Sequence, residues 1–248
     1  MHPVIVKFGP LTIYSYGLLV ASGFIIATFL AAKQAARIGI PEDKITTLSL
    51  LILISGITGA RVFYILLNIK DYISNPVEII MLMHGGLVFY GGAIFAFIAA
   101  VIYIKRAGLS VLETVDLLAP YIALGHSIGR IGCFLNGCCY GKPTSGPFGV
   151  VFQDGISRIP TQIYSSLLLL LLFIFLSICF KYRKFRGQVF FSYLIFYSVG
   201  RIFIENLRGD NMPVMLNLTF SQLISIFMFI IGAAGYFIVK GKIWKRTR

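Results

Sequence analysis

Charged residues are scarce in this sequence, and acidic residues are the scarcest. Only 12% of its 248 residues are charged, with 9 Asp and Glu against 22 Lys and Arg, whereas 58% are hydrophobic. The mean hydropathy is +0.87. This composition is typical of a polytopic membrane protein and argues against a soluble domain.

The sequence also has little cysteine, no internal repeat and no low-complexity segment. Four cysteines in a chain of this length do not indicate a disulfide framework, and we interpret Cys179 as a small buried apolar residue. The first apolar run, near residues 11–32, has no basic segment before it and no small-residue cleavage site after it. We therefore expect a retained membrane helix rather than a cleaved signal peptide.

Several apolar runs are long enough to cross a bilayer. They lie near residues 11–32, 45–67, 88–104, 114–129, 161–180, 188–205 and 220–239. We predict an all-α polytopic membrane protein with about seven transmembrane helices in a single integral membrane domain over residues 1–248. Two glycine-rich and proline-containing regions interrupt the pattern, and we expect an interfacial or re-entrant arm at 68–92 and a small extracytoplasmic loop region at 130–160.

The basic residues gather in four short segments that alternate with poorly charged connections. These segments hold 14 of the 22 Lys and Arg: Lys33, Arg37 and Lys44; Lys105 and Arg106; Lys181, Arg183, Lys184 and Arg186; and Lys240, Lys242, Lys245, Arg246 and Arg248. By the positive-inside rule, this distribution places the N-terminus outside and the C-terminus in the cytoplasm. It explains the net charge of +13 without nucleic acid.

Helix-start signals account for several acidic residues. Pro41-Glu42-Asp43 precedes one apolar run, and Ser110-x-x-Glu113 and Thr219-x-x-Gln222 are typical capping boxes. We therefore interpret Glu42, Glu113 and Asp116 as first-turn helix residues rather than catalytic carboxylates.

The segment from Gly129 to Gly141 differs from the lipid-compatible runs, with one arginine, one asparagine and three cysteines among its glycines. A charge at membrane depth costs at least about 2.5–3.5 kcal/mol, so Arg130 needs a partner or an anionic ligand. We interpret the cysteines as packing residues. No metal site is expected, because no set of histidine or carboxylate ligands is near them in the sequence.

A second polar feature is formed by Tyr197, Arg201, Glu205 and Arg208, which are spaced i, i+4, i+8 and i+11. This spacing places them on one face of a helix. One interpretation is an ordinary Arg201–Glu205 pair near a helix end. The other is a polar stripe that lines a wet cleft, where Glu205 orients Arg201 toward an anion.

Arg61 stands alone within an apolar run. It either extends its charged end to the membrane surface or joins Arg130 and Arg201 in a common site. Guanidinium groups recognise phosphate in a bidentate manner, and a bilayer offers phosphate as lipid headgroups. A phospholipid is therefore the expected ligand.

These motifs resemble the prolipoprotein diacylglyceryl transferases of bacteria. The resemblance rests on the core Gly-Arg-x-Gly-x-Phe-x-Asn-Gly within residues 129–137, the Tyr197 to Arg208 stripe, Gly59-Ala60-Arg61 and Tyr14-Ser15-Tyr16-Gly17. It implies transfer of the diacylglyceryl group of phosphatidylglycerol to the lipobox cysteine thiol of a prolipoprotein, with glycerol phosphate as the leaving group. It also implies a multi-pass protein of the bacterial cytoplasmic (inner) membrane, with its active site toward the extracytoplasmic face.

The resemblance assigns roles to particular residues. Arg130 and Arg201 would hold the lipid phosphate with Glu205 as their support, and Asn136 and Tyr16 would complete the headgroup pocket. Tyr90 stands where the family commonly has a histidine, so it either acts beside an arginine or replaces a group that is not essential. His84 is an alternative proton acceptor or a structural residue.

Weaker assignments complete the site. Cys138 stands where many relatives have glutamate, which argues against a required carboxylate there. Gln162 and Tyr164, in a fragment similar to the family's entry to its fifth span, are either helix-start or cleft-lining residues. We expect a monomer without cofactor. A phospholipid or anion transporter and a non-catalytic lipid-binding protein are the alternative functions.

Overall fold

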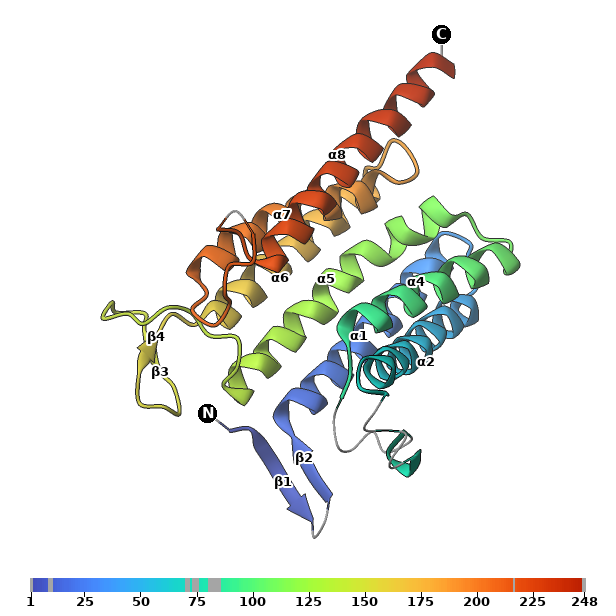
Figure 1. Ribbon diagram of the computed structural model, residues 1–248. Helices are drawn as coiled ribbons and strands as arrows, with labels where there is room; N and C mark the ends of the chain where they lie inside the picture. The colour runs from blue at the N-terminus through green and yellow to red at the C-terminus, as the bar shows by residue number, and fades with distance from the viewer. Residues whose placement is uncertain are drawn as a thin grey trace. The chain divides into compact units, whose positions relative to one another are not determined.

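The computed structural model describes residues 2–8, 11–69, 72, 76–79, 86–215 and 217–246. The long helices of this part of the chain are α1 (Ser15–Arg37), α2 (Glu42–Leu67), α4 (Phe89–Arg106), α5 (Val111–Asn136), α6 (Thr161–Lys181), α7 (Gln188–Leu207) and α8 (Phe220–Arg246). Each contains one predicted apolar run or most of it. The predicted mainly helical architecture is therefore confirmed (Figure 1).

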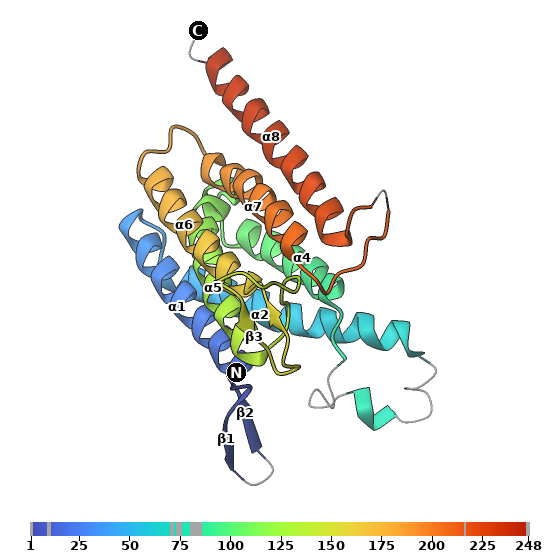
Figure 2. The ribbon, with the colours of Figure 1, turned by 90° about the vertical axis from the view of Figure 1, so that its left-hand side faces the viewer.

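The remaining elements are small. Two antiparallel hairpins are formed by β1 (Val4–Phe8) with β2 (Leu11–Tyr14) and by β3 (Val150–Val151) with β4 (Ser157–Arg158), and η1 (Pro76–Ile79) is a short 3-10 helix. Figure 2 shows the β1–β2 hairpin projecting from the start of α1. The first predicted helix thus begins later than expected, because residues 11–14 form a strand.

Five helices are long and apolar enough to cross a membrane by length and composition. They are Ser15–Arg37, Glu42–Leu67, Phe89–Arg106, Thr161–Lys181 and Phe220–Gly241. The described helices therefore support a multi-pass membrane protein.

The chain forms two compact units. One comprises residues 1–31 and 115–248, and the other comprises residues 32–114. In the first unit, Figure 1 shows α5 between α1 on one side and α6 and α7 on the other. Its core is made of buried residues from α5, α6 and α7: Ala119, Ala123, Leu172, Leu176, Val189, Tyr193 and Leu194.

The glycines of α5 allow close contact with α1. A Cβ atom at Gly125 would lie 3.2 Å from the carbonyl oxygen of Gly23, and one at Gly132 would lie 3.3 Å from the Cα atom of Tyr16. Small residues let helix backbones approach in this way. On the opposite side of α5, the hydroxyl of Ser127 donates to the carbonyl oxygen of Ser166 over 2.9 Å. These contacts hold α5 between its neighbours.

Asp116 has a different role from the one expected. Its carboxylate accepts hydrogen bonds from the backbone N–H groups of Gly187 (2.7 Å) and Phe190 (2.8 Å), and its side chain is buried. The first-turn interpretation is therefore wrong for Asp116, which instead binds the unpaired N–H groups at the start of α7. Glu42 and Glu113 do lie in first turns, of α2 and α5.

The predicted capping box before α8 is confirmed. The side chain of Gln222 accepts from the backbone N–H of Thr219 over 2.9 Å, and the Thr219 hydroxyl accepts from the N–H of Gln222 over 3.3 Å. This reciprocal pair satisfies two backbone donors at the start of the helix.

In the second unit, α2 and α4 pack closely. A Cβ atom at Gly91 would lie 2.5 Å from the carbonyl oxygen of Gly59, a distance that real side chains do not adopt. Beside this contact, Phe63 and Phe95 meet edge to face with their ring centroids 6.4 Å apart. The Gly91-Gly92 pair is therefore a helix-packing feature. Of the predicted arm at 68–92, residues 70–71, 73–75 and 80–85 lie outside the described part.

The predicted loop region at 130–160 begins later than expected. Helix α5 continues to Asn136, so Arg130 lies within the helix rather than at its end. The glycines in this stretch do not interrupt the helix, because they pack against α1.

Candidate functional site

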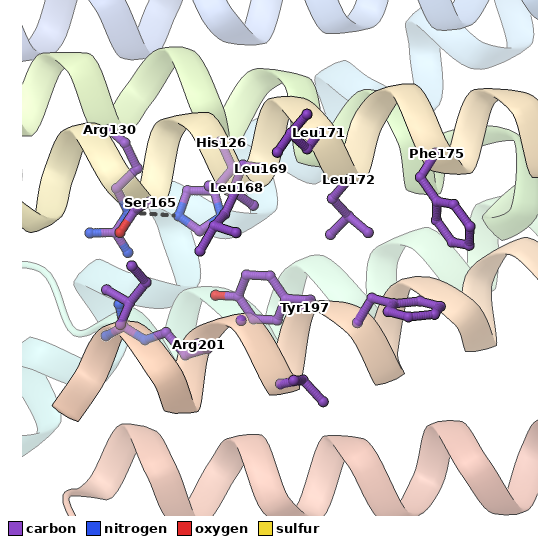
Figure 3. A pocket seen from close by; sticks show the side chains of 14 residues that line it. His126, Arg130, Ser165, Leu168, Leu169, Leu171, Leu172, Phe175, Tyr197 and Arg201 are labelled. Atoms are coloured by element: carbon purple, nitrogen blue, oxygen red, sulfur yellow. Dashed lines mark hydrogen bonds between the residues drawn. The ribbon is translucent and has the colours of Figure 1, made fainter. Parts of the chain in front are cut away.

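A cavity of about 330 Å³ lies between α5, α6 and α7 in the first unit. Its lining residues are His126, Arg130, Ser165, Leu168, Leu169, Leu171, Leu172, Phe175, Phe196, Tyr197, Val199, Gly200, Arg201 and Ile204. Figure 3 shows that the two arginines gather at one end with Ser165, and that Leu172 and Phe175 line the opposite end. The cavity is therefore amphiphilic, with a cationic end and a long apolar end.

Arg130 enters the cationic end from α5. Its Nε atom donates to the Nε2 atom of His126, one turn earlier, over 3.2 Å (Figure 3). Among the residues that the structure describes, no carboxylate forms an ion pair with Arg130. Its two terminal nitrogens are thus suited to an anionic ligand. Such a ligand was expected from the free-energy cost of an arginine at membrane depth.

Arg201 enters the same end from α7 and is held by Glu205. The Nη2 atom of Arg201 lies 3.0 Å from the Oε2 atom of Glu205, whose side chain is completely buried. The other carboxylate oxygen of Glu205 accepts from the Thr219 hydroxyl over 3.0 Å and from the side chain of Asn211. These bonds fix the carboxylate, and the carboxylate fixes the guanidinium.

Arg208 extends this network away from the cavity. Its guanidinium donates two bonds to Asp210, of 2.8 Å and 2.7 Å, and lies 3.9 Å from Glu205. Burial alone would lower the pKa of Arg208, but Asp210 outweighs it and raises that pKa, so the residue stays charged. The polar stripe is thus divided: Tyr197 and Arg201 line the cavity, whereas Arg208 supports Glu205.

Both earlier interpretations of the stripe describe part of the structure. The ordinary Arg201–Glu205 pair at i, i+4 is present. Tyr197 and Arg201 also line the cavity, and the ring of Tyr197 lies 5.9 Å from that of His126, measured between centroids. The helical spacing alone placed these residues on one face, and the cavity explains why they are polar.

Asn136 and Tyr16 lie outside the residues that line the cavity. Asn136 is the last residue of α5. Tyr16 is the second residue of α1 and packs against Gly132, two residues after Arg130. Tyr16 therefore lies close to the part of α5 that carries Arg130, and Asn136 lies less than two turns beyond it.

Gln162 and Tyr164 stand at the start of α6, as their helix-start interpretation predicts. Gln162 is buried, and its Nε2 atom donates to the carbonyl oxygen of Cys138 over 2.6 Å. Neither residue lines the cavity. The structure thus gives Gln162 a backbone-holding role.

Arg61 and Tyr90 belong to the second unit. Arg61 is buried, and its guanidinium donates to the backbone carbonyls of Ile79 (3.1 Å), Gly86 (3.2 Å) and Glu78. It also lies over the ring of Tyr72, 5.4 Å from the centroid. Arg61 therefore organises the described part of the 68–92 arm. Tyr90 is in the first turn of α4 and is 44% exposed.

His126 is a titratable cavity residue that the sequence analysis did not identify. A lone histidine in an apolar helix matched no motif, although its i, i+4 spacing with Arg130 was a usable signal. His84, the proton acceptor considered from the sequence, lies outside the described residues.

The comparison with known proteins decides the family. The family model described as prolipoprotein diacylglyceryl transferase matches residues 3–238. The chain belongs to the prolipoprotein diacylglyceryl transferase family. The resemblance predicted from the motifs is thus confirmed, and it extends over nearly the whole chain.

Relatives within this family cover most of the chain and of their own length. A phosphatidylglycerol–prolipoprotein diacylglyceryl transferase of Clostridium tetani is 42% identical over 238 residues, which are 94% of this chain and 95% of the relative. A Clostridium perfringens protein named phosphatidylglycerol–prolipoprotein diacylglyceryl transferase 2 is 37% identical over 253 residues, 100% of this chain and 99% of its own. A Bacillus cereus transferase of the same name is 35% identical over 240 residues, 92% and 88% respectively.

Proposed function

We propose that this protein transfers the diacylglyceryl group of phosphatidylglycerol to the lipobox cysteine thiol of prolipoproteins. This is the first step of lipoprotein maturation, and the names of the relatives match it. The observation that carries the proposal is the cavity, because Arg130 and Arg201 meet at one end of an otherwise apolar space. A phospholipid has the complementary distribution of charge and apolar surface.

The reaction requires charge stabilisation at the leaving phosphate. A carbon–sulfur bond forms at the glyceryl carbon while the carbon–oxygen bond to phosphate breaks, and the electron pair leaves with glycerol phosphate. The negative charge that grows on the leaving oxygens is stabilised by two fixed guanidiniums. Glu205 holds Arg201 for this task, and His126 holds Arg130.

The sulfur nucleophile reacts as a thiolate, and its proton must be taken up. Tyr90 remains our proposed participant in this step, at the first turn of α4. Asn136, Tyr16, Tyr197, Arg61, Arg208, Gln162 and Tyr164 remain the proposed substrate-binding residues. For Arg61, Arg208 and Gln162 this is an indirect role, through the segments that they hold.

The membrane arrangement is part of the proposal. All seven long helices cross the membrane, with the N-terminus outside, the C-terminus in the cytoplasm, and the active site toward the extracytoplasmic face of a bacterial cytoplasmic membrane. The placement of the basic clusters supports this orientation. We propose a monomer whose partners are phosphatidylglycerol and prolipoprotein signal peptides, without nucleic acid.

The decisive experiment mixes the purified full chain with phosphatidylglycerol vesicles and a lipobox peptide, and follows the peptide by mass spectrometry. We expect the peptide to gain one diacylglyceryl group. Arg130→Ala and Arg201→Ala should each reduce kcat by about 100-fold or more, since removal of one donor to a developing anion has this effect. Arg201→Lys should recover little, because an ammonium lacks the planar fork of guanidinium.

The matched control is Arg37→Ala, which removes an exposed arginine at the end of α1 and should retain activity. Peptide that never gains mass would overturn the transferase proposal. Movement of lipid across the bilayer without a mass gain would favour a transporter. Binding of lipid with neither result would favour a non-catalytic lipid-binding protein.

A further inference from the structure

The three cysteines of the Gly129 to Gly141 segment converge in space. The Sγ atoms of Cys133, Cys138 and Cys139 all lie within 4.8 Å of one another. In a tetrahedral zinc site with Zn–S bonds of about 2.3 Å, neighbouring sulfurs are about 3.8 Å apart. The three thiols therefore need to close by less than about 1 Å to share one ion.

The turn after α5 produces this convergence. The N–H of Cys138 donates to the carbonyl oxygen of Cys133 over 3.2 Å, and the N–H of Gly137 donates to that of Phe134 over 3.1 Å. These two bonds, with Gly137 at φ 74°, form a Schellman motif. The motif folds the chain back, so that Cys138 returns to the last turn of the helix that carries Cys133.

The backbone beyond this turn is held from α6. The hydroxyl of Thr161 donates to the carbonyl oxygen of Cys139 over 2.8 Å, and the amide of Gln162 donates to that of Cys138 over 2.6 Å. Both α6 side chains are buried. The two adjacent cysteines are thus fixed in place by a neighbouring helix, as preorganised ligands should be.

Cys139 has a strained backbone conformation. Its φ angle is 62°, in the left-handed region that glycine adopts without cost. A non-glycine residue is strained there, because its Cβ atom lies too close to the following carbonyl oxygen. The chain therefore keeps a thiol at a position where glycine would relieve strain, which points to a function of the sulfur.

We propose that Cys133, Cys138 and Cys139 bind one thiophilic metal ion, with zinc(II) as the representative ligand. No metal was expected from the sequence, because no set of histidine or carboxylate ligands is near the cysteines. Three thiolates are a sufficient set for zinc when a fourth position stays open. Among the described residues, the Sγ atoms of these three cysteines are the ligand atoms that this site offers to a metal ion.

The charge around the thiols fits an anionic metal–thiolate complex. Zinc with three thiolates carries one net negative charge. Two arginines lie close to the thiols: Arg130 precedes Cys133 by about one turn of α5, and Arg208 forms a β-bridge with Gly141, two residues after Cys139. Because Cys133 follows Arg130 by three residues on α5, the metal site adjoins the arginine end of the cavity without sharing its lining.

The test measures metal binding by the purified full chain, without lipid or peptide. Protein reduced and freed of metal by chelation is equilibrated with zinc, and bound zinc is counted by mass spectrometry of the metal. We expect about one ion per chain. Loss of a residue that only supports a metal ligand typically lowers metal affinity by about 10-fold to 100-fold. Because Cys133→Ser and Cys138→Ser each remove a ligand itself, we expect each to lower the affinity for zinc by more than this.

Two further variants make the test specific. Cys139→Gly relieves the strained backbone and removes one sulfur, so its loss of zinc cannot be assigned to misfolding. Cys179 lies in α6 and is not one of the three clustered cysteines, so the Cys179→Ser variant should bind zinc as the unmodified chain does. With cadmium, the sulfur-to-metal absorption in the ultraviolet should decrease by about one third in each single-thiol variant that still binds.

Equal zinc binding by Cys139→Gly, Cys133→Ser and the unmodified chain would overturn the proposal. So would a disulfide between any two of the three cysteines in protein purified without reductant. Because neither measurement uses phosphatidylglycerol or peptide, failure of the metal site and failure of the transferase proposal are separate results.

Discussion

At the scale of single residues, the site depends on how each arginine is held. Glu205 is completely buried and fixed by Thr219, so it can orient Arg201. Removing one partner of such a buried pair costs about 3–5 kcal/mol because it leaves an uncompensated charge. Arg130 and Arg201 line one cavity, and the sequence had singled out both because a charge at membrane depth is costly. It could not predict that Arg61 instead binds backbone carbonyls, since these lie far along the chain.

His126 should act as a positioning residue for Arg130. His126→Ala removes the acceptor of the hydrogen bond that the Arg130 Nε atom donates. A hydrogen bond to a charged group contributes about 1.5 kcal/mol, so we expect kcat for transfer to fall by about 10-fold. His126→Gln offers a carbonyl acceptor at a similar distance and should restore most of the rate. Steady-state kinetics with phosphatidylglycerol separate kcat from KM.

The control for this prediction is His2→Ala, which removes an exposed histidine near the N-terminus. A purely structural role for His126 would lower the melting temperature and the rate together, with no rescue by glutamine. That outcome would contradict the positioning role.

At the scale of elements, the sequence predicted where helices lie better than where they end. Apolar runs identified all seven long helices, because length and hydropathy are local properties. The end of α5 was missed by seven residues, since its last turns are polar and glycine-rich but are stabilised by α1. Asp116 was misassigned for a related reason, because its partners begin a helix about 70 residues later.

The start of α7 should depend on Asp116. Asp116→Ala leaves two N–H donors at a buried helix end without acceptors, and we expect a loss of about 1–2 kcal/mol in the free energy of unfolding. Thermal unfolding in detergent, followed by circular dichroism, measures this. Asp116→Asn keeps one acceptor oxygen and should lose less. Asp43→Ala, at an exposed first-turn position of α2, should change stability by no more than about 0.5 kcal/mol.

At the scale of the whole molecule, the five helices that meet a simple membrane criterion and the seven predicted spans differ for a physical reason. The two remaining helices, α5 and α7, carry the arginines, histidine and glutamate of the site. These polar groups lower the hydropathy of the helices that contain them. Polar side chains of a functional site thus lower the hydropathy of α5 and α7 below that of the other long helices.

The two topologies make opposite predictions for two loops. If α5 and α7 cross the membrane, residues 137–160 lie outside and residues 182–187 lie inside. If they do not cross, these locations are exchanged. A protease site inserted after Gly155, an exposed turn residue, should be cut from outside in spheroplasts, and one inserted after Lys184 should be protected. The reverse pattern would contradict seven spans.

The length of the cavity along α6 has a consequence for how a lipid would reach the arginines. From Ser165 beside them to Phe175 at the far end, ten residues rise about 15 Å, half of a hydrocarbon core of about 30 Å. An acyl chain laid along this wall stays within the thickness of one leaflet. Exposing each methylene to water would cost about 0.8 kcal/mol. The enzyme would therefore receive its lipid by lateral diffusion, and the acyl chains would stay within the hydrocarbon region of the bilayer.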